Sequence, residues 1–349
     1  MTNYKHRYAL LLGLLLALLS FPSFIPINNP FDTKALDAID ADIRNDLYGK
    51  ISSLIIYKGP RIVYEKYYGF SQFSTLHPIS SVTKSITSLV AGMCIDKGYI
   101  PSLDVKIKDY FPEYKEIFDK DTLKQQITLR HLLTQTSGLQ WDEWNILYSY
   151  AGNPLIEYSH SQENWCGLVL KQPMSTAPGC NFCYNSFLSE LIKEIISRSS
   201  GVPFQRFVED SLFKRMNIST YHWDSYQGNG VPAWGGLFLS TRDMAKFGTL
   251  ILNKGVWGDT RVVSKGWIES SIAPLADAGK VNYGLHWWVG KQSDGNPLIF
   301  AAGYGDQYVY VAPDKGIVIA FNGQNFADHK WTYSQEELIT NVLKAYKNN

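Results

Sequence analysis

The chain has 349 residues, of which 45% are apolar and 19% are charged, with 33 Lys and Arg against 32 Asp and Glu. This balance excludes intrinsic disorder, and a formal net charge of +1 leaves no cationic excess for binding a nucleic acid. Four cysteines are too few for a disulfide-stapled scaffold. We therefore expect two domains, or one large unit with an insertion, and no nucleic-acid partner.

The first 29 residues have the pattern of an export signal. A basic stretch that ends at Arg7 precedes an apolar run over residues 8–19, as in the charged and apolar regions of secretory signals. A helix over residues 8–21 would reach about 21 Å, short of the ~30 Å hydrocarbon core of a bilayer. We expect an exported, periplasmic or secreted protein with a signal peptide over residues 1–29. The alternatives are an uncleaved N-terminal membrane anchor, the only membrane contact expected, and a buried helix.

Apolar periodicity predicts strands at both ends of the chain and helices between them. The predicted strands cover residues 51–57, 61–68, 283–289, 307–311 and 317–321. The predicted helices cover residues 32–48, 81–97, 128–135, 185–198, 203–214, 241–253 and 334–346, with Thr241 as a candidate cap of the helix that it begins. We therefore predict an α/β fold of the α+β type, in which helices flank one antiparallel sheet built from both chain ends.

The same pattern predicts two lobes within one domain over residues 30–349. An α/β lobe takes about residues 30–98 and 235–349, and a mostly helical insertion takes about residues 99–234. Clefts between two such lobes are common positions for functional sites. We expect the site of this protein in that cleft.

Ser81 and Lys84 form the first candidate motif. Ser81 begins a predicted helix and Lys84 follows at i+3, so the two side chains face the same way. A serine hydroxyl needs a nearby base to act as a nucleophile, and a lysine with a lowered pKa can be that base. The helix N-terminus also offers N–H groups to an oxyanion. Ser211 and Lys214 have the same spacing, so a helix cap beside a solvated lysine is the alternative interpretation.

Two further segments carry candidate chemistry. Residues 178–186 place Tyr184 in a turn before an apolar helix. A tyrosine beside a lysine can have a depressed pKa and relay a proton, although Tyr184 can equally pack in the core. Residues 300–307 contain glycines beside a strand, where a substrate can approach the backbone closely, unless they form an ordinary loop.

In this order, the three motifs resemble those of the serine β-lactamase and penicillin-binding-protein superfamily. The sequence is most similar to its β-lactamase-related hydrolases, which include class C β-lactamases, esterases and 6-aminohexanoate-dimer hydrolases. Residues 131–139, 235–243 and 283–288 resemble the same group, so the resemblance extends over about residues 50–325. It implies a β-lactamase/transpeptidase-like fold and a serine hydrolase that uses neither a metal nor a cofactor.

The resemblance also implies roles for individual residues. Ser81 would be the acylated nucleophile, Lys84 its proton acceptor and Tyr184 a second proton carrier. The backbone N–H groups of Ser81 and Tyr304, which follows Gly303, would form the oxyanion hole.

Two positions depart from the pattern of the family. Ser186 stands where the family often has a substrate-binding Asn, and we keep it as a candidate substrate contact. Trp234, before a Gly-Gly pair, is a further candidate contact. Where β-lactamases carry Lys-Thr-Gly or a His variant, this chain has residues 301–303, Ala-Ala-Gly. Losing a charge-assisted contact to a substrate carboxylate costs about 1.5–3 kcal/mol. We therefore expect hydrolysis of an ester or short amide through an acyl-enzyme, rather than efficient β-lactam hydrolysis.

Several alternatives stay open at this point. The substrate could be a short peptide, as for a D-amino-acid peptidase or carboxypeptidase of the cell envelope, or a β-lactam. A non-catalytic envelope binding protein could also retain the fold. Cys166, Cys180 and Cys183 could form a disulfide, although free thiols are favoured. Together with His160 they could also bind zinc, but their irregular spacing argues against such a site. We expect His131 to be a structural hydrogen-bonding residue at a helix start.

Overall fold

The computed structural model describes residues 30–326 and 334–347. An eight-stranded antiparallel sheet with the order β2-β1-β13-β12-β11-β10-β9-β8 forms its centre. The export-signal prediction falls on residues outside the described ranges. Within those ranges, every helix is too short or too polar to span a bilayer.

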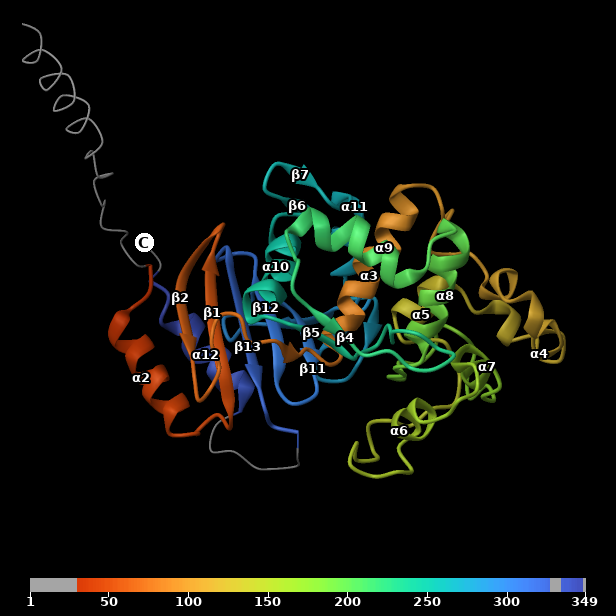
Figure 1. The fold of residues 1–349 in the computed structure, drawn as a ribbon, viewed down its shortest axis with the longest axis horizontal. Coiled ribbons are helices and arrows are strands. Elements are labelled where there is room, and N and C mark those ends of the chain that lie inside the picture. Colours follow the sequence, from red (N-terminus) through yellow and green to blue (C-terminus); the bar gives the residue numbers. More distant parts are fainter. Residues whose placement is uncertain (1–29, 327–333, 348–349) are drawn as a thin grey trace, which may run out of the picture.

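The central sheet joins strands from both ends of the chain, as predicted (Figure 1). Its strands are β1 (Ile51–Lys58), β2 (Arg61–Tyr67), β8 (Ala276–Asp277), β9 (Asn282–Tyr283), β10 (Trp288–Lys291), β11 (Pro297–Gly303), β12 (Gln307–Ala312) and β13 (Ile317–Gly323). Smaller sheets contain β3 (His77–Pro78), β4 (His222–Trp223) and β5 (Leu237–Leu239), and β6 (Val256–Trp257) and β7 (Thr260–Arg261).

Alternate residues of the central strands enter two separate cores, because side chains on a strand point to opposite faces. Val318 and Ala320 of β13 pack toward α3 (Val82–Asp96) and α10 (Thr241–Leu252). Ile317 and Ile319 pack on the other face against α2 (Thr33–Arg44) and α12 (Gln335–Lys344). Helices therefore cover both faces of the sheet (Figure 1).

The predicted helical insertion forms a second region beside the sheet (Figure 1). Its helices are α4 (Lys115–Asp119), α5 (Leu129–Leu133), α6 (Pro154–Ser159), α7 (Trp165–Leu170), α8 (Leu188–Ser200) and α9 (Phe204–Val208), which continues into a π-helical turn over Glu209–Phe213. A further helix, α11 (Lys265–Ser271), packs against α3.

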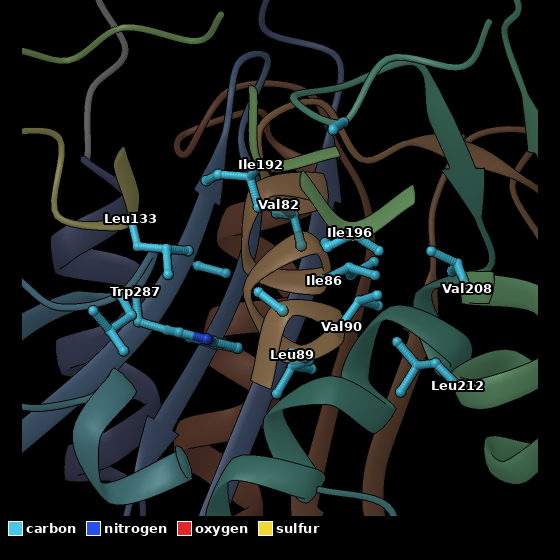
Figure 2. Close-up of a cluster of buried hydrophobic side chains, with 14 of the residues drawn as sticks. Val82, Ile86, Leu89, Val90, Leu133, Ile192, Ile196, Val208, Leu212 and Trp287 are labelled. Carbon is cyan, nitrogen blue, oxygen red and sulfur yellow. The ribbon is translucent and has the colours of Figure 1, made fainter. Parts of the chain in front are cut away.

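Helix α3 lies at the junction of the sheet and the helical insertion. Its residues from Val82 to Cys94 are all buried, and polar side chains among them find buried partners: Ser85 and Thr87 donate to the carbonyls of His286 and Ala233. Figure 2 shows Ile86 and Val90 of α3 among the side chains of α8, including Ile192 and Ile196. This packing holds the N-terminus of α3, and therefore Ser81, in a fixed position.

Three local predictions were wrong. Residues 283–289 are not one strand, because a turn in which His286 has a φ of +59° separates β9 from β10. The strand β11 was not predicted, since its alanines, glycine and proline are weak strand formers. Ser240 rather than Thr241 caps α10, because the Thr241 hydroxyl is buried and bonds Asn322 at 2.7 Å.

Candidate active site

The structure brings Ser81 and Lys84 into direct contact at the N-terminus of α3. Lys84 Nζ donates a hydrogen bond to Ser81 Oγ at 2.9 Å and a second to the Trp234 carbonyl at 3.3 Å. The Ser81 side chain makes no capping bond to the helix. Its hydroxyl is therefore directed to the lysine and not used as a helix cap.

Burial makes Lys84 a better base than a solvated lysine. The side chain is 1% exposed, and desolvation lowers its pKa from 10.5 to about 8, against the opposing effect of the Glu143 and Glu190 charges. A lysine with this pKa has a substantial neutral fraction near physiological pH. Lys84 can therefore accept the proton of the Ser81 hydroxyl.

Tyr184 completes the cluster but with a pKa opposite to the one expected. Lys84 Nζ lies 4.9 Å from the centre of the Tyr184 ring. Burial and the Glu143 charge raise the pKa of Tyr184 well above 10, although a hydrogen bond with Ser81 opposes them. The expectation of a depressed pKa is thus wrong, because desolvation is the largest effect on this buried phenol. Tyr184 is a neutral phenol that can donate a proton.

The second Ser-x-x-Lys pair has a different environment. Ser211 lies in the π-helical turn, and the Lys214 side chain is 67% exposed and pairs with Asp210. Lys214 is therefore solvated, and the Ser211–Lys214 pair provides a natural comparison for the Ser81–Lys84 pair.

The end of β11 lies against the loop that precedes the candidate nucleophile. Ser80 Oγ donates to the Tyr304 carbonyl at 2.9 Å. A Cβ atom at Gly303 would lie 2.4 Å from the Ile79 carbonyl oxygen, so only glycine allows this approach. The Tyr304 hydroxyl donates to the Phe326 carbonyl. The Tyr304 backbone therefore lies beside the loop that leads into Ser81.

Two predicted substrate contacts do not fit the structure. Ser186 is fully buried, and its N–H and Oγ donate to the Glu143 carboxylate at 2.7 and 2.6 Å, so no substrate can reach it. The Trp234 ring packs on Phe187 and Trp165 and is not among the groove-lining residues. Trp234 contributes its carbonyl to Lys84 instead.

Glu143 was not singled out from the sequence. The side chain is 1% exposed, and besides both Ser186 donors it accepts hydrogen bonds from Trp141 Nε1 at 2.8 Å and the Tyr148 hydroxyl at 3.0 Å. The available signal was its position between two tryptophans, Trp141 and Trp144, which suggests a loop that packs in the core. Glu143 joins the loop before α6 to the turn that carries Tyr184.

A groove of about 2100 Å³ opens at Ser81. The lining residues include the aromatic side chains of Trp144, Tyr148, Tyr184, Trp288 and Tyr304. Trp144 stacks on Tyr184 with 5.0 Å between the ring centres. The groove therefore combines a reactive hydroxyl with walls that favour apolar ligands.

The remaining candidates are structural. The described residues contain no cluster of three or more His, Cys, Asp and Glu suited to a metal, and Cys166, Cys180 and Cys183 are free thiols. His131 forms a capping box with Thr128 at the start of α5, as predicted.

Comparison with known proteins identifies the family. The model of the family described as Beta-lactamase matches residues 52–335. The chain belongs to the β-lactamase family. The resemblance to the serine β-lactamase and penicillin-binding-protein superfamily is thereby confirmed, as is the predicted fold.

Individual members of the β-lactamase family are only distantly similar to this chain. Beta-lactamase-like protein 4 of Dictyostelium discoideum is 26% identical over 341 residues, which cover 83% of this chain but only 59% of that protein. The 6-aminohexanoate-dimer hydrolase of Paenarthrobacter ureafaciens is 23% identical, covering 84% of this chain and 78% of its own. The octameric penicillin-binding protein homologue of Pyrococcus abyssi shares the fold, with a TM-score of 0.69, 20% identity and coverage of 89% and 76%.

Proposed function

We propose that this protein is a serine hydrolase that cleaves an uncharged carboxylic ester or short amide through an acyl-enzyme. The observation that carries the proposal is the 2.9 Å hydrogen bond from Lys84 Nζ to Ser81 Oγ, beside Tyr184 and at the end of an accessible groove. Family membership supports hydrolysis, and the 6-aminohexanoate-dimer hydrolase is a relative whose name indicates an amide substrate.

The proposed reaction has two halves, the acylation of Ser81 and the hydrolysis of the acyl-enzyme. Ser81 Oγ attacks the substrate carbonyl as its proton passes to Lys84 Nζ. The backbone N–H groups of Ser81 and Tyr304 stabilise the oxyanion. The Tyr184 phenol gives its proton to the leaving alcohol or amine and regains one from Lys84. Water then attacks the acyl carbonyl as its proton passes to Lys84 Nζ, and this proton returns to Ser81 Oγ when the bond to the acyl group breaks and the acid is released.

The preference for an uncharged substrate follows from β11. Ala301 is 1% exposed and faces the core, and the neighbouring Ala302 lines the groove with a methyl group. Neither alanine offers a cation or a hydroxyl to a substrate carboxylate. Binding of a carboxylate at this position would therefore lack a charge-assisted hydrogen bond.

Covalent labelling tests the assignment of the nucleophile. A fluorophosphonate is expected to add to Ser81 and to leave Ser211 unmodified, because only Ser81 has a buried lysine as its base. Peptide mapping by mass spectrometry locates the adduct. An adduct at another serine, or none in a folded protein, would contradict the proposed function.

The pH dependence of hydrolysis tests the role of Lys84. Lys84 acts as a base only when it is neutral, and its pKa is lowered to about 8. We expect kcat/KM to rise about tenfold per pH unit below this value and to level off above it. Lys214→Met should keep this profile, because Lys214 is solvated and outside the site. A profile that is flat from neutral to alkaline pH would exclude Lys84 as the base.

A further inference from the structure

A row of stacked aromatic rings leads away from the catalytic cluster. Trp288 of β10 stacks on Tyr184 with ring centres 6.0 Å apart, and Phe300 of β11 stacks on Trp288 at the same distance. Tyr310 of β12 follows at 5.1 Å from Phe300. We call Tyr184, Trp288, Phe300 and Tyr310 the aromatic row. All four residues line the groove that contains Ser81.

The outer surface of β10 and β11 is only partly covered by helices. Ile319 and Phe321 of β13 are buried in the core that α2 and α12 form. Leu298 and Phe300 of β11 pack against the edge of this core but stay half-buried. The middle of the aromatic row is thus accessible to a ligand that extends from Ser81.

Charged residues gather at the far end of the same strands. Lys315 and Asp294 lie in the turns after β12 and before β11 and form an ion pair at 2.9 Å. Along β11, Phe300 lies about 10 Å from Gly303, and Pro297 lies about 20 Å from Gly303. Near the catalytic end, the Asp306 carboxylate accepts hydrogen bonds from side-chain amides of two neighbours, Asn325 and Gln335. The aromatic row runs across the strands, because Trp288 pairs with Phe300 and Phe300 with Tyr310, so the Lys315–Asp294 ion pair lies to one side of it.

We propose that the groove binds an elongated, uncharged apolar or aromatic arm of the substrate along the aromatic row. This inference rests on the hydrolase function proposed above and names its substrate class. Each methylene that packs on the row leaves water, which increases transition-state binding if the contact is kept during the reaction. A carboxylate at the end of the same arm would lose its hydration against aromatic rings and is disfavoured.

A series of 4-nitrophenyl esters measures this preference. We expect kcat/KM of the wild type to rise by at least about tenfold from acetate to octanoate, since each methylene of a partly buried arm contributes part of the free energy of full burial. A matched series of acetate esters with lengthened alcohols tells whether the acyl or the alcohol side occupies the groove. Adding a terminal carboxylate to the preferred arm should remove most of the gain.

Phe300→Ala is the decisive variant, because Phe300 lies beyond the catalytic cluster. We expect it to reduce the ratio of octanoate to acetate activity several-fold, and this ratio is independent of the fraction of folded enzyme. Phe70→Ala is the control, since Phe70 is a fully exposed aromatic outside the groove. The proposal would be overturned if lengthening neither the acyl nor the alcohol chain raised the activity of the wild type. An unchanged octanoate-to-acetate ratio in Phe300→Ala would overturn it as well.

A binding measurement separates the groove from the reaction. Octanamide should change the tryptophan fluorescence of the inactive Ser81→Ala protein saturably, through Trp288 and Trp144, and bind several-fold more weakly when Phe300→Ala is added. Binding of octanamide without turnover of any ester or amide would retain the groove and refute the hydrolase function. Turnover without a length preference, or no preference for octanamide over acetamide, would refute the groove.

Discussion

Replacing Ser81 with alanine is expected to reduce kcat/KM for ester hydrolysis by ~10⁴-fold or more, as removal of the nucleophile does in other serine hydrolases. The loss follows because Lys84 activates only this hydroxyl. Among the described residues, no other serine beside Lys84 and Tyr184 accepts a hydrogen bond from a buried lysine. Steady-state kinetics on the best ester of the series above measures the effect.

The Ser81 substitution should leave the fold intact, because the Ser81 hydroxyl does not cap α3. Thermal unfolding of the Ser81→Ala protein should therefore be close to that of the wild type. Ser211→Ala is the matched control, with the same Ser-x-x-Lys spacing and an exposed lysine. Full activity in Ser81→Ala, or a comparable loss in Ser211→Ala, would show that Ser81 is not the nucleophile.

Replacing Glu143 with alanine is expected to lower the free energy of unfolding by about 3–5 kcal/mol, since the substitution removes the charged acceptor of a buried hydrogen-bond network. Four donors would lose their partner: the Trp141 indole, the Tyr148 hydroxyl, and the N–H and hydroxyl of Ser186. A decrease in Tm of roughly 4–7 °C corresponds to this change in a chain of this size. Calorimetry or thermal circular dichroism measures the shift.

Glu143→Gln separates the network from its charge. The amide keeps one oxygen acceptor, so we expect a smaller loss of stability than in the alanine variant. The charge of Glu143 raises the pKa of Lys84, and its removal should move the rise of kcat/KM to lower pH. Glu157→Ala, on exposed α6, should change stability by less than about 0.5 kcal/mol. Equal stability of the wild type and Glu143→Ala would show that the network contributes nothing.

Local sequence patterns predicted the proximity of Ser81 and Lys84 because its geometry is local. Ser81 and Lys84 lie one helical turn apart, and the helix follows from an apolar run that ends near Gly98, whose φ is +73°. The hairpin of β1 and β2 was equally accessible, since two strand-like segments flank Gly59. In these cases, residues close in sequence determine the structure.

The tertiary structure decided the features that depend on distant residues. The sign of the Tyr184 pKa shift depends on burial and on Glu143, 41 positions away in the printed numbering. The burial of Ser186 depends on the same carboxylate. The aromatic row is also invisible locally, because Trp288, Phe300 and Tyr310 meet only through the pairing of three strands.

The sequence by itself therefore determined the fold class, the family and the pairing of Ser81 with Lys84, since these depend on ordered motifs and helical spacing. Only the tertiary structure decided the protonation of the tyrosine, the role of Glu143 and the lining of the groove. The physical reason is that desolvation and side-chain stacking arise from residues that folding brings together, and no spacing along the chain encodes how deeply a group is buried.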